Sequence, residues 1–149
     1  MSASPSDLPK HDLLIDGQRV PPGTGAYTTD INPATEAPLA LVAQGSEADV
    51  DTAVRAARAA LKGWAGMRAA DRARILNRFA DLLEAHAEEL VTLESQDAGK
   101  PLAAVRRQDL PAVIDTVRYY AGWCDKIHGS VIPARPDALT YTVREPVGV

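Results

Sequence analysis

Cys124 is the only cysteine in the 149-residue chain and its most nucleophilic side chain. A thiol attacks an electrophilic carbon as its thiolate, which needs a neighbouring base or cation. The sequence places Cys124 on the apolar face of a predicted helix, and none of the three histidines stands at a supporting spacing. The pattern therefore favours a buried, unreactive thiol over a nucleophile. A lone cysteine also excludes an internal disulfide and a cysteine-based zinc site, which is typical of a reducing cytoplasm.

Two acidic residues, Glu94 and Asp97, are the next candidates for chemistry. Three residues apart on a predicted helix, they share one face, where they could hold a cation or exchange protons. The alternative is a solvated helix end, which the local pattern favours. Gly23 and Gly25 form no phosphate-binding loop, because neither a G-x-x-x-x-G-K nor a G-x-G-x-x-G motif is present.

The composition is that of an ordinary globular chain, 46% hydrophobic and 24% charged, with a formal net charge of -4. Proteins that bind nucleic acid or anionic membranes carry a basic stripe, whereas the basic residues here alternate with acidic ones. No apolar run approaches the roughly 20 residues that cross a bilayer. The first residues also lack the pattern of a signal peptide. The sequence therefore predicts a cytoplasmic protein without a nucleic-acid or membrane partner.

Short extended segments are predicted to fill the first part of the chain. Residues 1–11 are rich in serine, proline and charge and are expected to form a disordered tail. Asp16 and Gly17 separate two short apolar-rich runs and accept the positive φ of a type I′ turn, which predicts a β-hairpin. Further strands are expected over residues 27–31 and 39–43.

A block of helices is predicted to follow, because the hydrophobic period changes at Ser46 from that of a strand to that of a helix. Ser46 is a suitable N-cap, and acidic residues occupy the first turn after it. Further helices are expected from about residue 70 and over about residues 87–97, with Gly99 as the C-cap.

Pro111 interrupts the helical pattern that resumes after Gly99. Proline lacks an amide hydrogen and clashes with the preceding turn, so a break is expected near Asp109, followed by a helix that runs to about His128. The rest of the chain is expected to be extended. This order predicts an incomplete α/β fold, because the helices come as a block before any long parallel strand.

Five segments of the chain form recognisable motifs: LLIDGQRV, DINPATEAPLALVAQGSEADVDTAVRAARAAL, RILNRFADLLEAHAEELVTLESQDAGKP, VRYYAGWCDKIHG and YTVREPVGV. Together they resemble the N-terminal region of NAD(P)-dependent aldehyde dehydrogenases, with the betaine-aldehyde and class 1/2 types most similar. The resemblance runs from Leu13 to Val149 and covers only the first part of the family's usual length. It implies that residues 12–138 are the N-terminal part of a cofactor-binding domain. Residues 139–149 would begin an oligomerisation strand of a homo-oligomer.

For a complete enzyme the resemblance implies oxidation of an aldehyde to a carboxylic acid with NAD or NADP, through a cysteine nucleophile and a glutamate base. The segments that carry these groups and the cofactor motifs have no match here, and Cys124 does not match the nucleophile. No catalytic or cofactor-binding residue is expected in this chain, and alone it should be inactive and bind no cofactor. The alternative is a truncated, non-catalytic product that associates with full-length subunits through its C-terminal strand.

The resemblance also implies two sets of site residues. A structural monovalent cation is expected, because backbone carbonyls and a carboxylate suit a hard ion. Its ligands in this chain would be Asp30, Ile31 and Asp97. An aldehyde entrance is also expected, lined by two positions one helical turn apart. Pro111, which lies between them, departs from the family pattern. The entrance residues would be Gln108 and Ala112.

Overall fold

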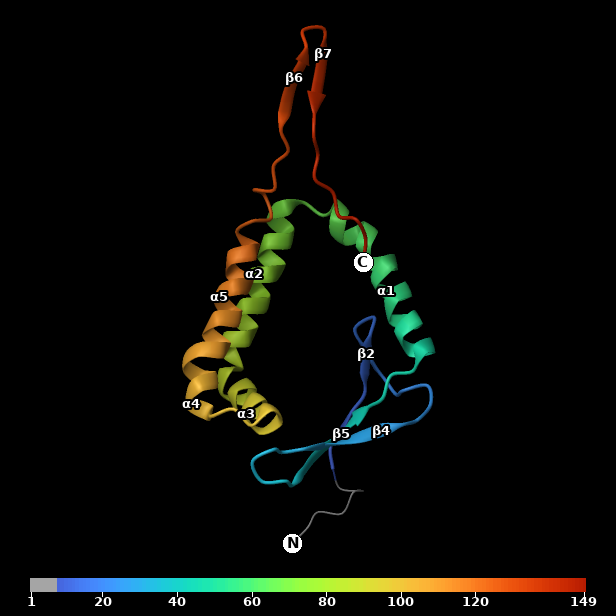
Figure 1. Cartoon of the computed structure of the whole chain (residues 1–149), viewed down its shortest axis with the longest axis vertical. Helices are drawn as coiled ribbons and strands as arrows, with labels where there is room; N and C mark the ends of the chain where they lie inside the picture. The colour runs from blue at the N-terminus through green and yellow to red at the C-terminus, as the bar shows by residue number, and fades with distance from the viewer. Residues whose placement is uncertain (1–7) are drawn as a thin grey trace.

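The structure is a computed structural model that describes residues 8–149. Short strands near the N-terminus are followed by a block of helices and then by a hairpin that projects far from both (Figure 1). Helix α1 stands on one side of an open arch, and α2 and α5 stand on the other (Figure 1). The expected α/β class and its incompleteness are therefore confirmed.

The predicted first hairpin is present. Strand β2 (Leu13–Ile15) pairs antiparallel with β3 (Gln18–Val20). Between them Asp16 and Gly17 have φ values of 51° and 72°, as a type I′ turn requires. The turn is local chemistry, which is why the sequence predicted it correctly.

A second, three-stranded sheet has the order β1, β5, β4. Strand β4 (Tyr27–Ile31) pairs antiparallel with β5 (Pro38–Ala43), close to the predicted boundaries. Strand β1 (Lys10–His11) pairs parallel with β5, so the expected tail over residues 1–11 is wrong at these two positions. Their pairing depends on a partner about 30 residues away, which no local pattern reveals. The rest of the expected tail, up to residue 7, lies outside the described residues.

Helix α1 (Glu47–Gly66) begins at the predicted N-cap. The Ser46 hydroxyl accepts a hydrogen bond from the Asp49 amide, and the Asp49 carboxylate accepts one from the Ser46 amide at 2.8 Å. The same carboxylate accepts the amide hydrogen of Gly23 at 3.2 Å. Asp49 thus caps the helix and attaches the preceding loop to it.

The capping box makes the start of α1 sensitive to acid. Hydrogen bonds from the backbone and side chain of Ser46 lower the pKa of Asp49 below its ordinary 3.8. Because the folded pKa is the lower one, the stabilisation is complete above the ordinary value and is lost as the pH falls through the depressed one. Circular dichroism from about pH 5 down to about pH 2 should show helix loss that Asp49→Asn reduces. An unchanged profile in Asp49→Asn would contradict this role.

Two further helices follow with short connections. Helix α2 (Ala69–Ala85) and α3 (Ala87–Ala98) match the expected elements, and Gly99 ends α3 with a φ of 69°. Helix α2 lies along α5. Arg118 of α5 pairs across this contact with Asp81 and Glu84 of α2, at 3.2 and 2.7 Å. These pairs are exposed, so each contributes less than about 1 kcal/mol.

The expected break before Pro111 is replaced by a π-helix. The chain stays helical through α4 (Leu102–Ala104), the π-helix Val105–Asp109 and α5 (Leu110–Ala121). The Leu110 amide donates to the carbonyl of Val105, five residues back. The wider turn accommodates a proline at the start of α5 without ending the helix. The prediction of a break was therefore wrong, although Pro111 does lie in the first turn of α5.

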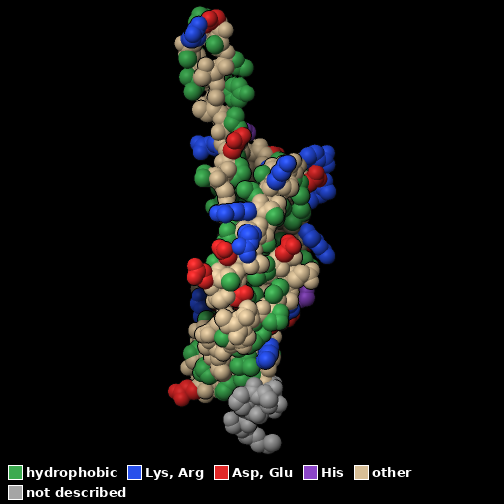
Figure 2. Space-filling view, turned by 90° about the vertical axis from the view of Figure 1, so that its right-hand side faces the viewer, with side chains coloured by type: hydrophobic (Ala, Val, Ile, Leu, Met, Phe, Trp, Pro, Cys, Tyr) green, Lys and Arg blue, Asp and Glu red, His purple; other side chains and the backbone are tan. Residues whose placement is uncertain are grey.

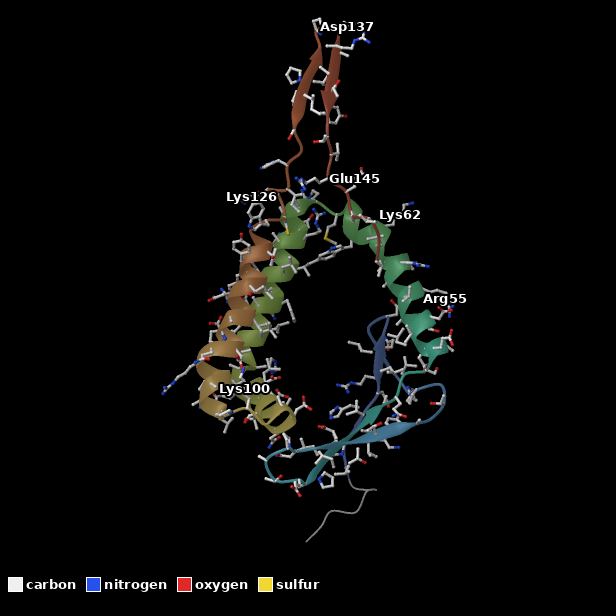
Figure 3. The ribbon with its side chains drawn as sticks, viewed as in Figure 1. Arg55, Lys62, Lys100, Lys126, Asp137 and Glu145 are labelled. Atoms are coloured by element: carbon white, nitrogen blue, oxygen red, sulfur yellow. The ribbon has the colours of Figure 1, made fainter. Side chains whose placement is uncertain are left out.

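The C-terminal part differs from expectation in two ways. Helix α5 ends at Ala121 rather than near His128, and turns follow it. Strand β7 (Ala138–Tyr141) pairs antiparallel with β6 (Val131–Arg135), so this chain itself supplies a partner strand. Residues 142–149 contain no regular strand, which corrects the expected strand over 139–149. Figure 3 shows Asp137 at the tip of this hairpin.

The described residues form only a small core. Its buried apolar side chains are Ala40, Ala80, Val91, Val105 and Ala121. Many larger apolar residues remain exposed, among them Phe79 at 49% and Trp64 at 40%. The predicted apolar faces of the helices thus exist but are largely uncovered. Among the described residues, no helix is both long and apolar enough to cross a membrane.

Candidate functional site

A cavity of about 700 Å³ lies between the three-stranded sheet and the helical block. Strands β4 and β5 form one wall, and α3, the π-helix and the start of α5 form the other. The lining is mostly apolar, with leucines and valines contributed by both walls. Four carboxylates also line it: Asp30, Glu94, Asp97 and Asp109.

Two of the expected cation ligands, Asp30 and Asp97, line this same cavity from opposite walls. The strand register shifts between Asp30 and Ile31, and such bulges take carbonyl groups out of the regular ladder. Ile31 itself is not part of the lining. Within residues 8–149, no three side chains of His, Cys, Asp or Glu are grouped so that they could hold a metal ion. These residues supply hard oxygen donors that fit a monovalent cation, but only part of a coordination shell.

Asp109 is a feature of the cavity that sequence reasoning missed. Its Oδ2 atom is buried, and Lys100 Nζ lies 2.5 Å away. The two side chains form an ion pair, and Oδ2 has no hydrogen-bond partner among the described residues. The π-helix positions Asp109 here, and π-helical turns are frequent at functional sites. The sequence signal that could have pointed to Asp109 is Pro111, which stands two residues after it and distorts the helix there.

The expected entrance residues lie elsewhere. Gln108 is on the π-helix and Ala112 is on α5, and both are exposed. Neither lines the large cavity, although their neighbours Asp109 and Val113 do. A role for Gln108 and Ala112 at an aldehyde entrance therefore remains a prediction.

Cys124 lies in the turn after α5, half-buried, rather than on the helix itself. Its thiol donates a weak hydrogen bond to the Tyr120 carbonyl at 3.7 Å. It does not line the large cavity. The predicted placement on a buried helix face is therefore wrong, and the lack of a nucleophilic role for Cys124 stays a prediction.

The loop around Gly23 and Gly25 is the remaining place to consider for a cofactor phosphate. A phosphate cradle needs free amide hydrogens and a positive field. Here the Gly23 amide already donates to the Asp49 carboxylate, so a negative charge occupies that position. Lys100 lies on the side of the structure opposite α1 (Figure 3) and so supplies no positive charge to the Gly23 loop, which is bound to the start of α1. These residues do not fit the phosphates of a nicotinamide dinucleotide.

Comparison with known proteins places these observations in a family. Residues 21–149 match the family model described as "Aldehyde dehydrogenase family". A mitochondrial aldehyde dehydrogenase of Mesocricetus auratus is 49% identical over 122 residues, which are 80% of this chain and 24% of that protein. The mitochondrial aldehyde dehydrogenase family 2 member B4 of Arabidopsis thaliana is 44% identical over 139 residues, which are 92% of this chain and 26% of that protein.

A solved structure agrees closely with this fold. The NAD+ complex of an aldehyde dehydrogenase from Bacillus cereus has a TM-score of 0.90 and 44% identity, over 93% of this chain. The chain belongs to the aldehyde dehydrogenase family. It spans only 24–28% of the length of these three proteins.

Proposed function

We propose that this chain is the N-terminal segment of an NAD(P)-dependent aldehyde dehydrogenase that oxidises an aldehyde to a carboxylic acid. The main support is structural similarity: 93% of the chain superposes on the Bacillus cereus NAD+ complex with a TM-score of 0.90. Catalysis then belongs to the longer polypeptide, and the 149 residues by themselves are inactive.

The segment contributes a cation site and an aldehyde entrance to that enzyme but no catalytic group. Asp30, Ile31 and Asp97 contribute to a monovalent cation site, supported by the two carboxylates on opposite walls of one cavity and by the bulge beside Ile31. Gln108 and Ala112 line the aldehyde entrance. NAD or NADP binds to residues outside this chain, which is consistent with the poor fit of the Gly23 loop. The enzyme is a cytoplasmic homo-oligomer in this proposal.

The first test is turnover. The purified chain, mixed with an aliphatic or an aromatic aldehyde and NAD+ or NADP+, should form no reduced nicotinamide. Joining the chain to the remaining segment of the Bacillus cereus enzyme should restore turnover, and Cys124→Ala should leave the activity of this fusion unchanged. Turnover by the isolated chain that depends on Cys124 would reject the proposal.

The exposed hairpin favours a second candidate function. All residues of β6 and β7 are exposed, including Val131 at 72% and Leu139 at 77%. Hydrophobic side chains cover much of this projecting arm (Figure 2). An apolar, unprotected strand edge is a template for pairing with another chain. The alternative is therefore a non-catalytic product that associates with full-length subunits through this arm.

Co-purification tests the second candidate. A tagged chain expressed with a full-length relative should retain that relative if the second candidate is correct. Leu139→Lys should then abolish retention, because a charge on the strand opposes pairing. The matched control Lys62→Glu changes charge on α1, away from the arm (Figure 3), and should have no effect. A monomeric chain that retains nothing would remove this candidate.

A further inference from the structure

Two ion pairs tie the π-helix to α3, and they differ in how far water reaches them. Arg106 pairs with Glu88 of α3 at 2.7 Å, and these side chains are 50% and 73% exposed. Asp109 pairs with Lys100, which follows α3, at 2.5 Å; its side chain is 33% exposed, and its Oδ2 atom is buried. Solvent screens an exposed pair, whereas charges attract more strongly where water is excluded. The pair of Asp109 with Lys100 is therefore the one expected to fix the π-helix.

The backbone holds Lys100 in place for this contact. Gly99 ends α3 with a left-handed φ of 69° and turns the chain. The Ser95 hydroxyl of α3 then donates a hydrogen bond to the Lys100 carbonyl at 2.6 Å. Removing only the Lys100 side chain therefore leaves the backbone tied to α3 but leaves the buried oxygen of Asp109 without its counter-charge, which is unfavourable. We expect the carboxylate then to turn toward water and to move the last turn of the π-helix.

The π-helix is a wide turn that lies next to both expected entrance residues. Its final hydrogen bond runs from the Leu110 amide to the Val105 carbonyl, five residues back. Such turns are rare and occur mostly as single bulges, frequently at functional sites. Asp109 directly follows Gln108 and stands three residues before Ala112. A movement of Asp109 therefore moves both of these residues.

We infer that Asp109 is a positioning residue: held by Lys100, it fixes the π-helix and thereby places Gln108 and Ala112 at the aldehyde entrance. The inference rests on the proposed function and adds to it a determinant of substrate size. Acetaldehyde has no chain long enough to contact an entrance, whereas the chain of octanal extends into one. Loss of the ion pair should therefore weaken the binding of octanal and leave the chemical step unchanged.

Hydrogen exchange and steady-state kinetics test the inference in the fusion to the remaining segment of the Bacillus cereus enzyme. Lys100→Met should raise KM for octanal about tenfold, while KM for acetaldehyde and kcat for both aldehydes change by less than about twofold. It should also speed amide exchange over residues 105–110 about tenfold or more. Lys100→Arg keeps the positive charge and should stay close to the parent. The matched control is Glu88→Gln, which removes the α3 partner of the exposed pair and should change neither measurement.

The outcomes separate this inference from the proposed function. Unchanged exchange in Lys100→Met overturns the inference. Faster exchange with no selective rise in KM for octanal also overturns it, because the pair is then only structural, while turnover by the parent fusion leaves the proposed function intact. A parent fusion without turnover counts against the proposed function, and exchange over residues 105–110 then decides the inference. If Lys100→Met does not fold, Asp109→Asn removes the other charge of the pair and should shift exchange and KM in the same direction.

Discussion

The isolated chain is expected to bind an apolar fluorescent dye strongly and to unfold over a broad temperature range without one sharp transition. These are the properties of a molten state, which keeps helices but lacks fixed packing. The reason is the small core, whose largest fully buried side chain is Val91. A domain is stable by only about 5–15 kcal/mol, and uncovered apolar surface forfeits roughly 25 cal/mol per Å². The small core therefore cannot hold the helices in fixed positions.

Calorimetry and dye fluorescence of the isolated chain measure this directly. The fusion to the remaining Bacillus cereus segment is the control, and it should unfold sharply and bind little dye. Aggregation of the isolated chain would have the same cause, because exposed apolar surface promotes association. A monomeric isolated chain with a sharp, cooperative transition would contradict the prediction.

Gly99→Ala is expected to destabilise the fusion by about 2–4 kcal/mol. Gly99 adopts a left-handed conformation with φ of 69°, which alone costs a residue with a Cβ about 1–2 kcal/mol. An added Cβ would also lie 2.6 Å from Cγ of Pro33, in the turn between β4 and β5. The proline ring cannot rotate away, so the sheet and α3 must separate. Chemical denaturation of the fusion measures the loss.

Gly25→Ala is the matched control for this prediction. Gly25 has a similar φ of 68°, but an added Cβ meets no atom within 4 Å. The control should therefore lose only the conformational term of about 1–2 kcal/mol. The difference between the two variants reports the contact of Gly99 with Pro33. Equal losses would show that this contact does not hold the sheet against α3.

Local chemistry explains the features that the sequence predicted correctly. The turn at Asp16 and Gly17, the N-cap at Ser46 and the C-cap at Gly99 each depend on a few neighbouring residues. Their conformations therefore follow from residue type and spacing. The family motifs can likewise be recognised from the sequence, because they are continuous segments of it.

Features that depend on distant partners were missed or only partly predicted. Strand β1 forms because Lys10 and His11 meet β5, about 30 residues away. The hairpin β6–β7 was missed although its strands are joined by a short local turn between Arg135 and Ala138. The π-helix before Pro111 allows the helix to continue although proline lacks an amide hydrogen. The hydrophobic period of the sequence does not predict this wider turn.

The sequence by itself determined the family and the class of fold, because each depends on residue identity along the chain. Only the tertiary structure decided that Asp30 and Asp97 line one cavity, that Asp109 joins them beside Lys100, and that apolar residues lining this cavity remain exposed. The physical reason is that proximity and burial arise between elements far apart in sequence. Their side chains converge only after the sheet and the helices have packed.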